Sequence, residues 1–138
     1  MPVSRRTFTA ALGAAGLGAA LPRAASRGDG AMYGLIGSFT TVPGQRDAFV
    51  AILLEGIHDM PGCLSYVVAA DTTDPDRLWV TEVWDSEASH AASLSLPGVR
   101  AAIARGRPLI AAMGSRVVTT PAGGHGLPAP PAAAPGDR

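Results

Sequence analysis

The 138-residue chain contains no lysine and no asparagine, and it has a single cysteine, Cys63. One cysteine excludes an internal disulfide and any metal cluster built on several thiolates. Charged residues make up only 16% of the chain and hydrophobic residues 47%. This composition excludes a highly charged disordered chain and is typical of one modest globular domain.

Positive charge is also scarce. The eleven basic residues, all arginine, balance eleven acidic residues over the whole sequence. Without residues 1–26, which hold Arg5, Arg6 and Arg23, eight arginines face eleven acidic residues, a net charge of −3. Phosphate binding needs clustered cationic surface. The charge balance therefore argues against nucleic acid as a partner.

The first 26 residues have the layout of a signal peptide. A polar start is followed by SRRTF at residues 4–8 and by an alanine- and glycine-rich stretch from Thr9 to Leu21. That stretch is shorter than the ~20 residues that span a bilayer, and Ala24–Ser26 fits a cleavage zone. Because SRRTF resembles the twin-arginine motif, we expect export to the periplasm or the extracellular space. After cleavage we expect no stable insertion in a membrane.

The remaining chain alternates strand-like and helix-like segments. Runs rich in β-branched and aromatic residues predict strands, and Pro-Gly pairs and acidic turns separate them. The expected strands are 33–42, 63–70, 77–84 and 115–120. The expected helices are 45–60, a segment from Asp85 or Ser86 to about Leu94, and one from Pro97 to Gly106. The LIAAM stretch at 109–113 is interpreted as an apolar turn, and the Gly/Pro/Ala-rich tail 121–138 is expected to have little order.

The order β-α-β-β-α-β over residues 31–120 predicts the ferredoxin-like α+β fold, with both helical regions on one face of the sheet. The expected strands carry apolar side chains on both faces; Leu64, Tyr66 and Val68, for example, alternate with Val67 and Ala69. An uncovered apolar sheet face in a small domain indicates an interface. We therefore expect a homodimer whose sheets pack face to face.

Three segments resemble a known family: MPGCLSYVVA (60–69), LWVTEVWDSEASHAASLSLP (78–97) and RGRPLIA (105–111). Their order and spacing are similar to those of the small antibiotic biosynthesis monooxygenase (ABM) domain, which includes bacterial quinol monooxygenases. The most specific stretch is Trp84-Asp85-Ser86-Glu87-Ala88 at the end of the third expected strand. The resemblance implies a dimeric α/β barrel and the cofactor-independent oxidation of a phenolic or quinol molecule by O2.

That implied chemistry needs no metal and no cofactor, because an ionised phenol is electron-rich enough to reduce O2 itself. The protein has to bind an apolar aromatic molecule, favour its anion and exclude water. The resemblance makes Trp84 a substrate contact, for which the alternative is a core or interface anchor. His90, six residues later, is the candidate catalytic base, and its alternative is a packing or surface histidine.

Three further residues are candidates for the site or its surroundings. Tyr66 could line the pocket, although a core role is also consistent with its strand position. Arg107, with Arg105, could supply positive charge to an anionic substrate; the alternative is a solvated helix end. Glu82, in the middle of a strand, is expected to pair across the dimer, for example with Arg77 or Arg116, since an isolated buried carboxylate is costly. The alternative is a perturbed carboxylate with a functional role.

The other titratable residues are expected to be structural or solvated. We expect His58 to be a surface residue and Cys63 a small buried one. We expect no metal site at His125 in the tail.

One departure from the family concerns Val80, four residues before Trp84. Anthrone-oxidising relatives carry an asparagine at that position, and haem-degrading relatives need one in the first strand, whereas this chain has none at all. Two alternatives to the monooxygenase therefore stay open. One is a non-catalytic dimer that binds small aromatic molecules, and the other is a cofactor-free isomerase or lyase of the same barrel fold.

Overall fold

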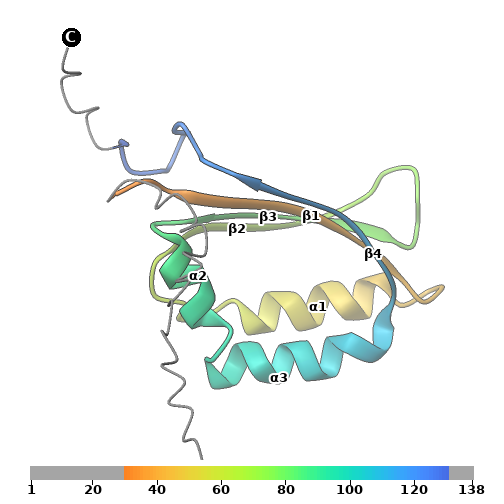
Figure 1. The fold of residues 1–138 in the computed structure, drawn as a ribbon. Coiled ribbons are helices and arrows are strands. Elements are labelled where there is room, and N and C mark those ends of the chain that lie inside the picture. Colours follow the sequence, from red (N-terminus) through yellow and green to blue (C-terminus); the bar gives the residue numbers. More distant parts are fainter. Residues whose placement is uncertain (1–29, 131–138) are drawn as a thin grey trace, which may run out of the picture.

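The structure, a computed structural model, describes residues 30–130. A four-stranded sheet forms one layer and the helices form the other (Figure 1). In chain order the elements are β1 (Tyr33–Thr41), α1 (Arg46–Gly56), β2 (Cys63–Ala70), β3 (Arg77–Trp84), α2 (Glu87–Ser93), α3 (Pro97–Gly106), the 3-10 turn η1 (Arg107–Leu109) and β4 (Ile110–Thr119). The predicted signal peptide, residues 1–26, and the end of the tail lie outside the described residues.

The sheet has the strand order β2-β3-β1-β4, and every neighbouring pair is antiparallel. Strands β1 and β3 are central, and each β-α-β crossover places its helices on the same face (Figure 1). This arrangement confirms the predicted ferredoxin-like α+β fold. None of the described helices is both long and apolar enough to cross a membrane.

Local sequence explains how the chain passes from β3 into α2. Trp84 ends the strand, and Ser86 caps the helix by accepting a hydrogen bond from the Ser89 backbone N–H at 3.1 Å. Such a cap satisfies one of the free N–H groups at the helix start. Gly62, in the turn before β2, adopts φ +83°, and a Cβ there would collide with the Ser89 side chain. The glycine therefore lets that turn pack directly against the first turn of α2.

Two predicted boundaries are wrong. Helix α1 ends at Gly56 rather than at residue 60, and the chain then turns through Asp59, which has φ 53°. Strand β4 begins at Ile110, so the LIAAM stretch is largely strand rather than a turn. Its first residues pair with the end of β1, as Ile110 with Thr41 and Ala112 with Thr40. Tertiary pairing decides this conformation, because alanine and methionine carry little strand propensity of their own.

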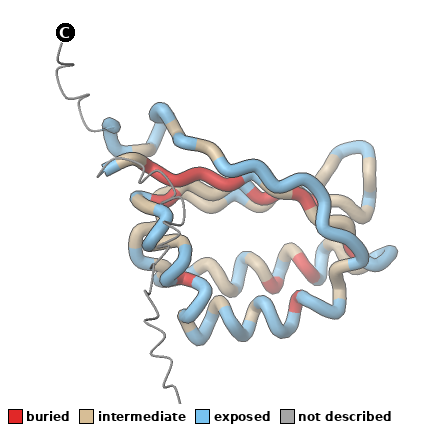
Figure 2. Tube along the Cα trace, viewed as in Figure 1, coloured by how far each residue is buried: buried red, intermediate tan, exposed pale blue. Residues whose placement is uncertain are grey.

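The hydrophobic core lies between the helices and the inner face of the sheet (Figure 2). One cluster is built on Phe49 of α1 with Leu78 and Val80 of β3. A second cluster, at the other end of the strands, joins Tyr33, Leu35 and Trp84. These residues lie on one face because Tyr33 pairs with Trp84, and Leu35 with Glu82, across β1 and β3.

The outer face of the sheet is left uncovered by the helices. One row of paired residues crosses it from β2 to β4: Val67, Thr81, Ile36 and Val117. Val67 and Val117 are each 51% exposed and Ile36 is 39% exposed. The sequence-based expectation of apolar side chains on both faces is therefore confirmed. Residues 121–130 of the tail form no helix or strand.

Candidate functional site

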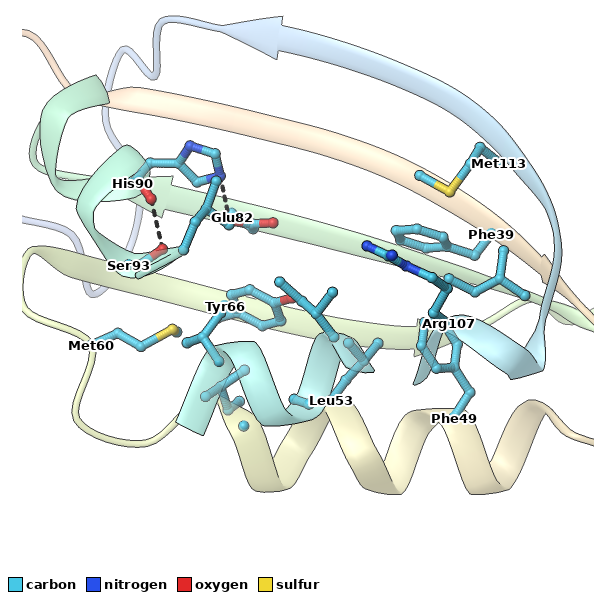
Figure 3. A pocket seen from close by; sticks show the side chains of 17 residues that line it. Phe39, Phe49, Leu53, Met60, Tyr66, Glu82, His90, Ser93, Arg107 and Met113 are labelled. Carbon is cyan, nitrogen blue, oxygen red and sulfur yellow. Dashed lines mark hydrogen bonds and ion pairs between the residues drawn. The ribbon is translucent and has the colours of Figure 1, made fainter. Parts of the chain in front are cut away.

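A cavity of about 570 Å³ lies between the inner face of the sheet and the helical layer (Figure 3). Its walls are mostly apolar, with Phe39 from β1, Phe49 and Leu53 from α1, and Val99 and Ile103 from α3. A volume of this size is typical of small-molecule sites, which combine apolar walls with a few convergent polar groups. The cavity therefore has the size and the lining of a small-molecule site.

Four ionisable side chains from four different elements line this cavity: Tyr66 of β2, Glu82 of β3, His90 of α2 and Arg107 of η1. Figure 3 shows the Glu82 carboxylate beside the His90 ring, while the Arg107 side chain reaches in from η1. Three of the four, Tyr66, His90 and Arg107, are residues that the sequence analysis proposed. The fourth, Glu82, was expected to pair with an arginine of a second subunit.

Glu82 has two partners within its own chain. Its Oε2 accepts a hydrogen bond from the Trp84 Nε1–H at 2.8 Å and lies 3.9 Å from His90 Nε2. Arg77, one of the expected partners, forms its ion pair with Asp74 at 3.4 Å. Because side chains alternate along a strand, Glu82 shares the inner face of the sheet with Val80 and Trp84 and lines the cavity.

Trp84 is not part of the cavity wall. It is 1% exposed and belongs to the core cluster with Tyr33 and Leu35. Its ring meets the His90 ring edge to face, with centroids 5.4 Å apart. The structure thus favours the core-anchor alternative for Trp84, which supports Glu82 and His90 from behind instead of facing the cavity.

His90 is held from several directions. Its side chain is 15% exposed, and its ring lies 5.3 Å from that of Tyr33. The Ser93 hydroxyl donates a hydrogen bond to the His90 backbone carbonyl at 2.6 Å, which adds a contact within the last turn of α2. With Nε2 turned towards Glu82 and the cavity, the imidazole is placed to exchange a proton with a bound molecule.

Burial raises the pKa of the Tyr66 phenol far above its usual value, and the negative charge of Glu82 raises it further. The pKa of the Cys63 thiol rises for the same two reasons, although its backbone contact with Ser65 opposes the change. Both groups therefore stay protonated at neutral pH. The Tyr66 hydroxyl can act as a hydrogen-bond donor in the cavity, and Cys63 has no thiolate character that would favour nucleophilic chemistry.

The two arginines near Pro108 have different surroundings. Arg105 forms an exposed ion pair with Glu55, with Nη1 and Oε2 2.7 Å apart, and does not line the cavity. Arg107 does line it. Of the two predicted sources of positive charge, only Arg107 can therefore reach a molecule in the cavity.

The remaining histidines lie outside the site. His58 is exposed, as expected, beyond the end of α1, and His125 is exposed in the tail. Over residues 30–130 no group of three or more His, Cys, Asp or Glu side chains is arranged to hold a metal ion.

Fold and cavity together define a class of protein: a ferredoxin-like α+β domain with a ligand-sized cavity between its sheet and its helices. Comparison with known proteins identifies the family. The sequence profile of the family described as antibiotic biosynthesis monooxygenase matches residues 32–105. The chain belongs to this family.

Solved structures agree with this assignment. A protein from Chloroflexus aurantiacus, described as a candidate antibiotic biosynthesis monooxygenase, is 65% identical over 70% of this chain and 99% of its own, with a TM-score of 0.69. Two less similar structures share the fold. A candidate family member from Nitrosomonas europaea is 17% identical over 67% of this chain and 91% of its own, with a TM-score of 0.62. Another from Caulobacter crescentus is 22% identical over 66% of this chain and 88% of its own, with a TM-score of 0.57. No curated protein matches the chain.

Proposed function

We propose that this protein is a cofactor-independent monooxygenase that oxidises a phenolic or quinol molecule with O2. The observation that carries the proposal is the apolar cavity that His90, Tyr66 and Arg107 all line. The apolar walls suit an aromatic substrate, and the polar side chains of the lining are available to its hydroxyl group. The family assignment supports the same class of reaction.

The proposed reaction begins with proton transfer. His90 Nε2 takes the proton of a substrate hydroxyl. The neutral Tyr66 hydroxyl donates a hydrogen bond to the phenolate oxygen, and the Arg107 guanidinium offsets its negative charge. The phenolate then gives electrons to O2, so that a hydroquinone and O2 yield a hydroxyquinone and water. One oxygen atom enters the ring and the other leaves as water, and the substrate supplies all four electrons.

Oxygen uptake tests this proposal directly. We expect the purified protein to consume O2 in equimolar amounts with at least one member of a panel of mono-, bi- and tricyclic hydroquinones, and labelled O2 to place one atom in the product. The dimethyl ethers of the same compounds, which cannot ionise, are the control and should not react.

Two results would contradict the monooxygenase. Saturable binding of every hydroquinone without oxygen uptake would indicate a binding protein. A product that forms equally well without O2 would indicate an isomerase or lyase that works by proton transfer alone.

We also propose that the protein is a homodimer joined through the outer face of the sheet. The support is the exposed apolar row of Val67, Ile36 and Val117, whose burial would remove apolar surface from water. Replacing Ile36 with Glu in central strand β1 is expected to shift the protein to a monomer in light scattering after size-exclusion chromatography. Leu54→Glu is the matched control, since Leu54 is 45% exposed on helix α1. A monomeric wild type would refute the dimer.

A further inference from the structure

Glu82 is a carboxylate placed in an apolar cavity. Its side chain is only 16% exposed, and an isolated carboxylate in such a place is costly. The Trp84 Nε1–H bond at 2.8 Å fixes Oε2, the same oxygen that lies 3.9 Å from His90 Nε2. A fully buried tryptophan therefore holds the carboxylate in one orientation beside the candidate base.

The distance between Glu82 and His90 indicates a charge interaction. At 3.9 Å the two atoms are too far apart for a hydrogen bond, yet close enough for a carboxylate to favour a protonated imidazole. Both side chains are largely shielded from water, which weakens screening of this attraction. The same carboxylate raises the pKa of Tyr66 and of Cys63, so its charge acts throughout this end of the cavity.

Among the described residues, the other charged and titratable groups on the elements near His90 form no ion pair with it. They are Tyr33 on β1, Tyr66 and Cys63 on β2, and Asp85 and Glu87 at the start of α2, while Arg107 on η1 lines the same cavity. Asp85 and Glu87 are exposed, so solvent screens them. Glu82 alone of the described acidic residues lies within ion-pair distance of His90 Nε2.

We propose that Glu82 is a positioning residue whose negative charge stabilises the protonated form of His90, and that Trp84 holds Glu82 in place for this task. The proposal rests on the proposed function, since it concerns the base of that reaction. When His90 accepts the substrate proton, a positive charge forms on a partly buried imidazole. Burial opposes this charge and Glu82 favours it, so the carboxylate makes His90 a stronger base. The proton later leaves with the water that is formed.

An NMR titration of the histidine ring signals tests the proposal without any turnover. The variant Glu82→Gln keeps the size of the side chain and removes its charge. Burial then disfavours the positive charge on His90 with no carboxylate to offset it. We expect the His90 ring signals to titrate at lower pH in this variant than in wild type, because the nearby negative charge is gone. His58 and His125 are internal references, and their titrations should not move.

Two further variants exclude a purely structural effect. Glu55→Gln removes an exposed carboxylate that pairs with Arg105 outside the cavity, and it should leave the His90 titration unchanged. Glu82→Asp keeps the charge at a slightly greater distance and should restore most of the wild-type value. Thermal unfolding of each variant shows that it is folded under the conditions of the titration.

The outcomes separate this inference from the proposed function. If the His90 titration is the same in Glu82→Gln and wild type, Glu82 does not act through His90, and the inference is overturned even if quinols are oxidised. If the titration falls and Glu82→Asp restores it, the inference stands even if no quinol is oxidised. Where oxygen uptake is observed, Glu82→Gln should also lower its maximal rate and move the acid limb of the pH–rate profile to lower pH.

Discussion

Replacing Trp84 with alanine is expected to lower the free energy of unfolding by about 3–5 kcal/mol, the usual cost of truncating a large buried aromatic side chain. The side chain is 1% exposed and fills the core between Tyr33 and Leu35. Its removal also takes away the Nε1–H that donates a hydrogen bond to Glu82 Oε2, which leaves a largely buried carboxylate with one hydrogen-bond donor fewer. Urea denaturation followed by circular dichroism measures the change.

Phenylalanine at the same position separates packing from hydrogen bonding. Trp84→Phe keeps an aromatic ring in the core but cannot donate to Glu82, and the loss of a donor to a buried charged group costs about 1–3 kcal/mol. Trp79 offers a matched control, because its Nε1–H donates to Asp71 at 2.9 Å. Asp71 is partly exposed and also accepts hydrogen bonds from Thr73 and from the Asp74 backbone N–H, so Trp79→Phe leaves it with other donors and should cost clearly less. Equal losses in the two variants would mean that Glu82 does not depend on Trp84.

Much of the fold follows from local patterns in the sequence. Strand-like runs separated by Pro-Gly pairs and acidic turns predict β2 and β3 to the residue, and the capping serine Ser86 marks the start of α2. The errors lie where the pattern is weak. The beginning of β4 is rich in alanine, and only its pairing with β1 makes it a strand. Helix α1 ends at Gly56, and the last residues expected in it form a turn before Pro61 in which Asp59 has a positive φ.

The site was less predictable than the fold because it depends on which face each side chain occupies. Tyr66, His90 and Arg107 were proposed, and they line one cavity. For Trp84 and Glu82 the sequence left two alternatives each: the structure buries the tryptophan behind the site, and it places the carboxylate in the cavity. Strand alternation could have placed Glu82 on the inner face, but only the tertiary structure shows that His90 lies opposite.

Replacing His90 with alanine is expected to lower kcat for quinol oxidation by about 10²–10⁴-fold, the usual contribution of a positioned general base. KM should change much less, because the apolar walls of the cavity supply most of the binding and remain intact. Oxygen uptake at saturating substrate measures the effect. His58→Ala is the control, since His58 is exposed beyond α1 and outside the cavity, and it should retain the wild-type rate.

The pH dependence makes this prediction specific to proton transfer. If His90 removes the substrate proton, the residual rate of His90→Ala should rise steadily with pH as the phenol ionises in solution without help. At a pH above the ionisation of the free substrate, the variant and wild type should approach each other. A variant that is equally slow at every pH would instead indicate that His90 shapes the cavity. An unchanged rate in His90→Ala would show that the substrate ionises without His90. Tyr66 and Arg107 alone would then suffice to stabilise the anion.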